Sequence, residues 1–348
     1  MPPSHLPGHA VSELANRKVL VAGGAGYIGS HMVKALLDAG CRVVTFDDLS
    51  SGHRDAVVGG EFVQGNIGDP AALASLFAAH RFDAAMLFAG SIQVGESVTN
   101  PALYYRNNVV NAICFLDALV ANGVRHLVFS SSAAIFGEPT RIPIDESHPC
   151  APLNPYGRSK LMLEQILEDY DRAYGLKSAC LRYFNAAGAD PDARLGERHD
   201  PETHLIPIAL EVALGLRPHL SVFGDDYETP DGTCIRDYIH INDLCQAHLL
   251  ALSALHSGQA SLAINLGNGA GFSVREVIDA VRRVTGHAIP VRICPRRAGD
   301  PAQLIADSHQ ARDRLGWQPA YPDLQDIVAH AWAWAKQTTE HPALPCAA

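Results

Sequence analysis

A tyrosine and a lysine one helical turn apart, Tyr156 and Lys160, are the residues of this sequence best suited to proton transfer. They stand in NPYGRSKLMLEQIL, where positions i and i+4 share a helix face. A phenol, with a pKa of about 10, is a poor base at neutral pH, but a neighbouring ammonium group lowers that pKa. Tyr156 could then take a proton from a hydroxyl or give one to a ketone, with Ser132 bonding the same oxygen. Alone, such a pair is more often a solvated helix surface, so its meaning depends on its surroundings.

A glycine-rich turn supplies those surroundings. The stretch KVLVAGGAGYIGSH predicts a strand, a turn and a helix start. Glycine lets the backbone approach a pyrophosphate closely, and a helix N-terminus offers that anion free N–H groups. Asp47 ends the next predicted strand, where a carboxylate can hold both adenosine ribose hydroxyls and repel a 2′-phosphate. The pattern favours binding of NAD over NADP, and both over a purely structural turn.

The elements that must position these residues follow from the hydrophobic pattern. Continuously apolar runs at 18–22, 42–46, 61–64, 83–88, 125–130 and 178–184 alternate with helical stretches at 27–39, 100–122 and 155–174. Such runs are typical of a parallel sheet covered on both faces. The alternation predicts an α/β fold with a Rossmann-type doubly wound sheet, whose ligands bind at the carboxyl ends of the strands. The glycine turn and Ser132 both belong at those ends.

The pattern of residue types changes after about residue 185, where glycine and proline occur more often. We therefore predict a smaller mixed α/β substrate domain, with helices at 205–214, 241–255, 274–285 and 323–337. The expected division is a tail at 1–16, a dinucleotide-binding domain at 17–185, a substrate domain at 186–338 and a tail at 339–348. Part of 235–256 could return to the first domain.

The amino-acid composition argues against several classes of binding partner. The 348 residues carry 27 Lys plus Arg against 37 Asp plus Glu, a net charge of −10, which argues against nucleic acid or anionic lipid as a general partner. No apolar run approaches the roughly 18 residues of a membrane span, and the N-terminus lacks the features of a secretory signal. Eight scattered cysteines have neither zinc-site nor disulfide-framework spacing. We expect a cytoplasmic protein with reduced thiols, a small-molecule substrate and no metal.

Several further segments, together with these motifs, are similar to those of a known protein family. They are FAGSIQVGESV, YYRNNV, FSSSAAIFGEP, LRYFNAAGADP, FGDDYETPDGTCIRDYIH, NLGNG and PRRAGDPA, in that order. From about Lys18 to Trp334 the chain resembles the extended short-chain dehydrogenase/reductase superfamily and, within it, the UDP-glucose 4-epimerase family. The resemblance implies a UDP-sugar substrate, a resident NAD, and a homodimer formed through helices near 100–122 and 155–174.

The resemblance also implies a mechanism with Tyr156, Lys160 and Ser132 as catalytic residues. Tyr156 takes the proton of the sugar 4-hydroxyl while NAD accepts hydride, and the 4-keto sugar turns over before it is reduced from its other face. The implied NAD-binding residues are Gly23, Gly26, Tyr27, Ile28, Gly29, Asp47, Asn66, Ile67, Phe88, Ala89, Gln93, Asn107, Ser130, Tyr156, Lys160 and Tyr183.

The second domain should hold the UDP-sugar. Arg236 and Arg297 would clamp its pyrophosphate, because guanidinium matches phosphate bidentately. Asp300 would accept a ribose hydroxyl, and Phe223 would cover uracil or serve as a core residue. The implied substrate-binding residues are Ser132, Tyr156, Asn185, His204, Leu205, Phe223, Arg236, Arg297, Asp300 and Leu304.

Four positions depart from the family pattern. Gln93 and Asn66 stand where Lys and Asp are frequent, so the grip on NAD could differ. His204 replaces an Asn of some members and either contacts substrate or packs. Leu304 is intermediate between the bulky Tyr and the small residues found in other members. We therefore expect N-acetylated UDP-sugars to enter to some extent.

The residues after Ser132 discriminate among reactions. Related dehydratases carry an Asp-Glu pair there and decarboxylases a Glu, whereas this chain has Ala133 and Ala134, which cannot move protons. Epimerisation at carbon 4 is therefore favoured. A 4-epimerase of another UDP-sugar (N-acetylated, uronic or pentose) stays open, as does a non-catalytic NAD-sensing protein, against which the intact Ser132, Tyr156 and Lys160 argue.

Overall fold

The computed structural model describes residues 12–297 and 299–340, so most of both predicted tails lies outside the described residues. Seven parallel strands form its main sheet, in the order β10-β6-β5-β4-β1-β2-β3. The prediction of a Rossmann-type sheet is confirmed. The strands are β1 (Lys18–Ala22), β2 (Arg42–Asp47), β3 (Glu61–Gln64), β4 (Ala84–Leu87), β5 (His126–Ser130), β6 (Lys177–Tyr183) and β10 (Leu262–Leu266).

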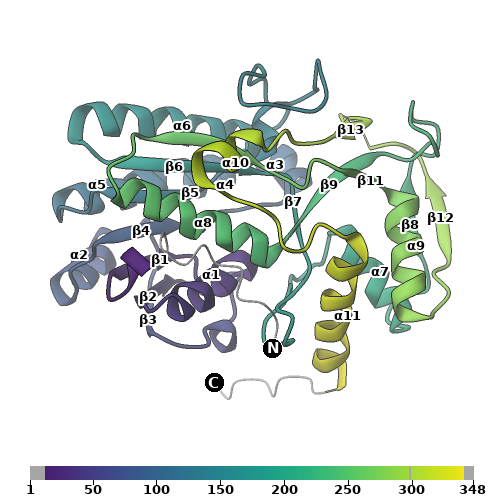
Figure 1. Ribbon diagram of the computed structural model, residues 1–348, viewed down its shortest axis with the longest axis horizontal. Coiled ribbons are helices and arrows are strands. Elements are labelled where there is room, and N and C mark those ends of the chain that lie inside the picture. The colour runs from purple at the N-terminus through teal and green to yellow at the C-terminus, as the bar shows by residue number, and fades with distance from the viewer. Residues whose placement is uncertain (1–11, 298, 341–348) are drawn as a thin grey trace.

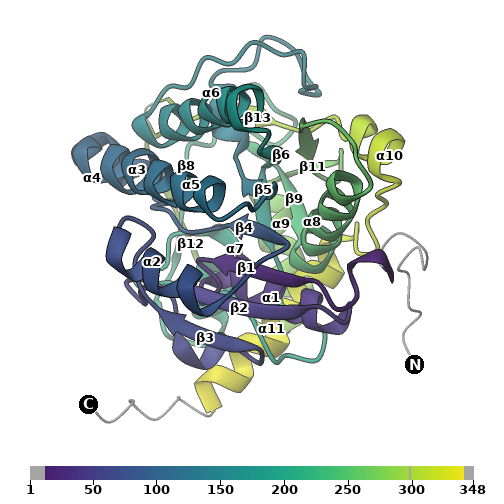
Figure 2. The same cartoon turned by 90° about the vertical axis from the view of Figure 1, so that its left-hand side faces the viewer.

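Helices cover both faces of this sheet (Figure 2). Helices α1 (Tyr27–Asp38) and α8 (Ile241–His256) pack on one face, and α2 (Pro70–Ala79), α5 (Asn111–Ala121) and α6 (Pro155–Tyr174) on the other. Neighbouring side chains of β1 show why the apolar runs are continuous. Val21 belongs to the first core and Leu20 to the second, and both are fully buried.

The predicted helix at 100–122 is not one regular helix. It consists of α4 (Pro101–Tyr105), a π-helical segment η3 (Arg106–Val110) and α5, preceded by the short α3 (Val94–Thr99). The irregularity coincides with Asn107 and Asn108, whose amides donate to the Ser91 side chain and carbonyl, both at 3.0 Å. Asparagine competes with helical bonding in this way, and π-helical turns are frequent at functional sites.

The second unit contains a small sheet ordered β11-β9-β13, with β7 also paired to β9, and a separate pair of β8 and β12 (Figure 1). A third core lies among α7 (Leu205–Ala213), α9 (Val274–Thr285) and α11 (Leu324–Glu340). The strands are β7 (Asn185–Ala187), β8 (Leu220–Phe223), β9 (Ile235–His240), β11 (Gly271–Ser273), β12 (Val291–Cys294) and β13 (Gln303–Leu304), and α10 (His309–Leu315) precedes α11.

The segment 241–266 lies with the main sheet, the alternative that the sequence left open for part of 235–256. Strand β10 extends the main sheet beside β6, and α8 packs against that sheet and α1, so the substrate unit is not continuous over 186–338. The reason is burial, because almost every residue of α8 is covered and one small unit could not cover it all round. The boundary at residue 185 stays a prediction.

Candidate active site

The glycine turn between β1 and α1 forms a tight cradle. Gly23 has φ +82°, and a Cβ there would lie 2.3 Å from the Ala89 nitrogen. A Cβ on Gly29 would lie 2.0 Å from the Gly23 carbonyl oxygen. Gly26 is the N-cap of α1 and has no side chain to occupy the helix N-terminus. Backbone N–H groups therefore stay available to a pyrophosphate, and the turn fits a dinucleotide.

Asp47 ends β2 beside this turn. Its carboxylate accepts the Ala25 and Leu49 backbone N–H groups, each at 2.9 Å, and burial raises its pKa. Asp47 thus holds the turn in shape at the position expected of a ribose-binding carboxylate. Asn66, on the next strand exit, donates to Asp48 at 2.6 Å and accepts from Gly68 at 2.7 Å, so its amide is already engaged.

The proposed catalytic residues come together at the carboxyl end of β5. Asn154 caps α6 by accepting the Gly157 N–H at 2.9 Å, and Pro155 occupies the first turn, which sets the helix start just before Tyr156. The Tyr156 and Ser132 side chains are hydrogen-bonded to each other. Lys160 Nζ donates to the Ser130 carbonyl at 2.8 Å and lies 5.8 Å from the Tyr156 ring centroid.

Burial dominates the titration of this group. It lowers the pKa of Lys160, whose side chain is almost fully buried, to about 8. It also raises the pKa of Tyr156, against a smaller lowering effect of the Ser132 hydrogen bond. The lowering of the phenol pKa expected from the ammonium together with a cationic nicotinamide stays a prediction for the protein with NAD bound. The cause of the raised pKa is burial of the phenol, and the Lys160 ammonium group points to the Ser130 carbonyl oxygen.

The sequence motifs did not indicate a buried network of amide hydrogen bonds near Lys160. Buried Asn108 accepts the Ser91 N–H at 2.7 Å and donates to Ser159 Oγ at 3.1 Å, which ties the loop after β4 to α6. A Cβ on Gly90 would lie 3.1 Å from Asn108 Oδ1 and 3.9 Å from Lys160 Nζ. Two adjacent asparagines within a predicted helix were the available signal, because asparagine is disfavoured there.

A buried ion pair supports the same helix face. Arg182 Nε donates to both Glu164 carboxylate oxygens, at 3.0 and 3.1 Å, and Ser131 donates to Glu164 as well. Glu164 lies one turn beyond Lys160, and its charge raises the pKa of that lysine in opposition to burial. Glu164 is therefore a positioning residue that the Tyr–Lys spacing did not indicate.

Predicted substrate residues of the second unit form two pairs. Arg236 and Asp300 form an ion pair, and the Arg297 guanidinium lies 4.0 Å from the Phe223 ring centroid. Leu304 stands next to Arg236 across the β13–β9 ladder. It packs against the small apolar cluster formed by Ala133, Ile135, Phe136 and Ile144, directly after Ser132. Strand pairing thus links the second unit to the catalytic strand end.

The other predicted residues lie around these two centres. Tyr27 Oη donates to the Gly188 carbonyl at 2.7 Å, and Tyr183 bonds Ser130 through its hydroxyl. His204 precedes α7, with Nδ1 2.6 Å from Glu197 Oε1. The remaining ones are Ile28 in the first core beside Phe88, Ile67 and Ala89 in the second core, Gln93 before α3, Asn185 opposite Tyr238 on β9, and Leu205 at the start of α7.

Comparison with known families agrees with this geometry. A protein-family model, that of the NAD dependent epimerase/dehydratase family, matches residues 19–267. The chain belongs to this family. The predicted membership of the extended short-chain dehydrogenase/reductase superfamily is thereby confirmed.

Within the family the chain is similar to proteins named UDP-glucose 4-epimerase. The one from Halalkalibacterium halodurans is 53% identical over 324 residues, 93% of this chain and 96% of that protein. The crystal structure from Brucella ovis, in complex with NAD, is 50% identical with a TM-score of 0.90 and covers 92% of this chain and 99% of its own. The UDP-Glc/GlcNAc 4-epimerase of Campylobacter jejuni is 45% identical with a TM-score of 0.81, at 92% and 100% coverage.

Among the described residues, no helix combines the length and apolarity needed to cross a membrane.

Proposed function

We propose that the protein is a UDP-glucose 4-epimerase, an isomerase that interconverts UDP-glucose and UDP-galactose with a resident NAD. The observation that carries the proposal is the cluster of Ser132, Tyr156 and Lys160 at one strand end of the sheet that also holds the glycine turn. The names of relatives about half identical over nearly the whole chain support it.

The residues that would hold NAD are those of the glycine cradle, with Asp47 at the ribose position and Lys160 near the reacting end. When bound, NAD supplies a centre that accepts a hydride from carbon 4 of the sugar and returns it. The tight approach of Gly23 to the Ala89 backbone leaves room only for glycine there, which fits this use.

The chain's own residues handle the proton. Tyr156 Oη takes the proton of the 4-hydroxyl as that carbon is oxidised and returns a proton to the same oxygen after the sugar has presented its other face. Ser132, bonded to Tyr156, orients that oxygen. Lys160 supplies the positive charge beside the phenol ring. Ala133 and Ala134 bring no second acid or base, so water loss and decarboxylation do not compete.

Arg236 and Arg297 are the proposed ligands of the UDP diphosphate. In the protein by itself Arg236 is paired with Asp300, and Arg297 lies over Phe223. When a nucleotide binds, Arg236 would exchange the Asp300 carboxylate for phosphate oxygens, and Asp300 would accept a ribose hydroxyl. Arg297 would likewise turn to the diphosphate, and the uracil base would take its place on the Phe223 ring. His204, Asn185, Leu205 and Leu304 complete the proposed substrate set.

We also propose that the protein is a homodimer and works in the cytoplasm. Exposed apolar side chains on α3, α4, η3 and α6 support a dimer face. They are Val98, Leu103, Val110 and Met162. In the described part of the chain seven cysteines are free thiols, a usage typical of a reducing compartment.

A single comparison tests the function. Purified protein, without added NAD, is given UDP-galactose, and products are resolved by chromatography. We expect conversion to UDP-glucose, lowered roughly 100- to 10,000-fold in Tyr156→Phe. Tyr174→Phe, a half-exposed tyrosine at the end of the same helix, is the matched control and should keep full activity. Bound NAD is measured in each protein, so that loss of cofactor is not mistaken for loss of proton transfer. Full activity of Tyr156→Phe would contradict the proposal.

A further inference from the structure

Four side chains of one short segment converge outside the proposed catalytic cluster, and one of them, His204, also belongs to the proposed substrate set. Glu197, His199, Glu202 and His204 lie between β7 and α7, and one ligand atom from each lies within 4.8 Å of all the others. His199 Nδ1 is 3.2 Å from Glu197 Oε1 and 3.7 Å from Glu202 Oε2. His204 Nδ1 is 2.6 Å from Glu197 Oε1 and 3.3 Å from Glu202 Oε1. Both imidazoles thus present Nδ1 to the same two carboxylates.

The hydrogen bonding of this cluster is incomplete. Within the described residues, Nδ1 of His199 and Nδ1 of His204 are both buried and neither has an aligned hydrogen-bond partner, despite the short distances. The side chains of Glu197 and Glu202 are only 7% and 6% exposed. Buried polar atoms normally have partners, and each of these two Nδ1 atoms still lacks one among the residues described. A cation at the centre of the four atoms would supply it.

We propose that Glu197, His199, Glu202 and His204 bind one divalent metal ion of the zinc class. With both imidazoles neutral, as metal ligands must be, the two carboxylates leave a charge of −2, which a divalent ion neutralises. A mixed set of imidazole and carboxylate donors suits zinc better than the all-oxygen sets of calcium or magnesium. All four positions come from protein, as in a structural zinc site. The expectation of no metal rested on cysteine spacing, which does not detect a His/Glu set.

The surroundings are built to hold the ligands in place. Glu202 Oε1 accepts the Thr203 and His204 backbone N–H groups, at 2.7 and 2.8 Å, which orients that carboxylate. Trp334 on α11 donates to the Glu197 carbonyl at 3.2 Å. Such outer contacts commonly fix metal ligands.

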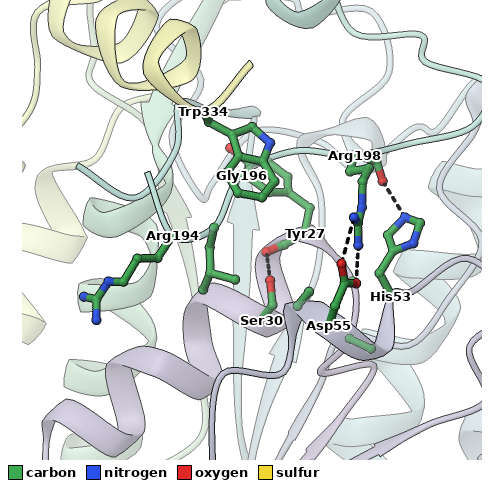
Figure 3. A pocket seen from close by; sticks show the side chains of 12 residues that line it. Tyr27, Ser30, His53, Asp55, Arg194, Gly196, Arg198 and Trp334 are labelled. Atoms are coloured by element: carbon green, nitrogen blue, oxygen red, sulfur yellow. Dashed lines mark hydrogen bonds and ion pairs between the residues drawn. The ribbon is translucent and has the colours of Figure 1, made fainter. Parts of the chain in front are cut away.

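The segment that carries the proposed ligands contacts the first unit near the glycine turn. Arg198, between two of the ligands, pairs with Asp55, and its carbonyl lies 3.3 Å from His53 Nε2 (Figure 3). The His199 ring is edge-on to that of Tyr27, with centroids 6.3 Å apart. A bound ion would therefore fix the shape of the segment 197–204, which these contacts place beside the start of α1.

Zinc binding to the full-length protein, purified without a histidine tag and treated with chelator, tests this. Zn²⁺ alone is titrated by calorimetry, and retained metal is measured by mass spectrometry after dialysis. We expect one zinc per chain and a higher thermal unfolding temperature with zinc. His199→Ala should lower the affinity by more than the roughly 10- to 100-fold typical of losing an outer contact. His287→Ala, an exposed histidine of the second unit, is the control and should bind as the parent does.

A second variant guards against misfolding. If His199→Ala does not fold, Glu202→Gln keeps the shape of the side chain, removes its charge and should also lose zinc. Co²⁺ bound to the parent should give visible absorption that Zn²⁺ abolishes. Substoichiometric zinc, or equal affinity in the parent and the ligand variants, would overturn the proposal. The four residues would then form only an ion-paired cluster of protonated imidazoles and carboxylates.

Discussion

At the scale of single residues, the environment of Lys160 shows how the fold tunes its chemistry. Burial lowers the pKa of this ammonium group to about 8, while the charge of Glu164, one helical turn away, works in the opposite direction. Glu164 is itself held by Arg182 and Ser131. The ion pair of Glu164 and Arg182, which is not in contact with the phenol, therefore helps Lys160 to keep its charge near neutral pH.

Leu304 sets a prediction about substrate size. It is half-buried and packs against Ala133 and its apolar neighbours, beside Ser132. In Leu304→Tyr the larger ring should fill the space that an N-acetyl group needs. We expect the parent to convert UDP-N-acetylglucosamine at least about tenfold faster than the variant, since a pocket that loses room for one small group discriminates by 10- to 200-fold.

The measurement is epimer formation from UDP-N-acetylglucosamine and from UDP-galactose in parallel. UDP-galactose, which has no N-acetyl group, is the internal control, and both proteins should convert it. Equal failure of both proteins on the N-acetylated sugar would remove the reason for a broad specificity.

At the scale of elements, buried carboxylates hold segments that are distant in sequence. Asp243, in the first turn of α8, accepts the Ala320 and Tyr321 backbone N–H groups, at 2.8 and 2.9 Å. Asp237 on β9 accepts those of Asn268, Gly269 and Ala306. Each carboxylate thus joins separate segments by accepting hydrogen bonds from backbone N–H groups that are not paired within their own segment.

The titration of Asp243 gives a prediction about stability and pH. Burial raises the pKa of this carboxyl from 3.8 to about 6. The folded state therefore holds the proton more tightly than the unfolded state, and stability from this group falls as pH rises through that window. Relative to Asp243→Asn, the parent's free energy of unfolding should decrease by up to about 3 kcal/mol between pH 4 and 7, at about 1.4 kcal/mol per unit of pKa difference.

Urea unfolding of the two proteins at a series of pH values measures this difference. The asparagine variant serves as the reference that does not titrate at this position. Parallel pH profiles would mean that Asp243 ionises with an ordinary pKa.

At the scale of the whole molecule, the exposed apolar side chains on α3, α4, η3 and α6 predict the state of assembly. These elements lie together on one side of the molecule (Figure 2). Val98 and Val110 are 62% and 60% exposed, and a monomer seldom leaves several such residues on one face. A double substitution, Val98→Lys with Met162→Lys, should therefore convert a dimer to a monomer.

Light scattering coupled to size-exclusion chromatography gives the mass directly. Leu216→Lys, at an equally exposed leucine after α7, is the control and should leave the mass unchanged. A parent with the mass of one chain would rule out the dimer.

Features that depend on neighbours along the chain could be predicted from the residues alone. The start and end of β1 and α6 agree with the predicted 18–22 and 155–174, because glycine, proline and capping asparagine act within a few residues. The Tyr–Lys spacing and the glycine turn are local in the same sense. The glycine turn with Asp47 indicated the cofactor, and these motifs together with the further matching segments indicated the family.

Contacts that join distant segments became visible only in the folded protein. Strand β10 lies beside β6, Arg236 pairs with Asp300, and Asn108 connects Ser91 to Ser159. The interrupted helix at 106–110 and the convergence of Glu197 with His204 belong to the same class. The physical reason is that burial and pairing depend on which surfaces meet in three dimensions, and the spacing of residue types along a chain does not specify those surfaces.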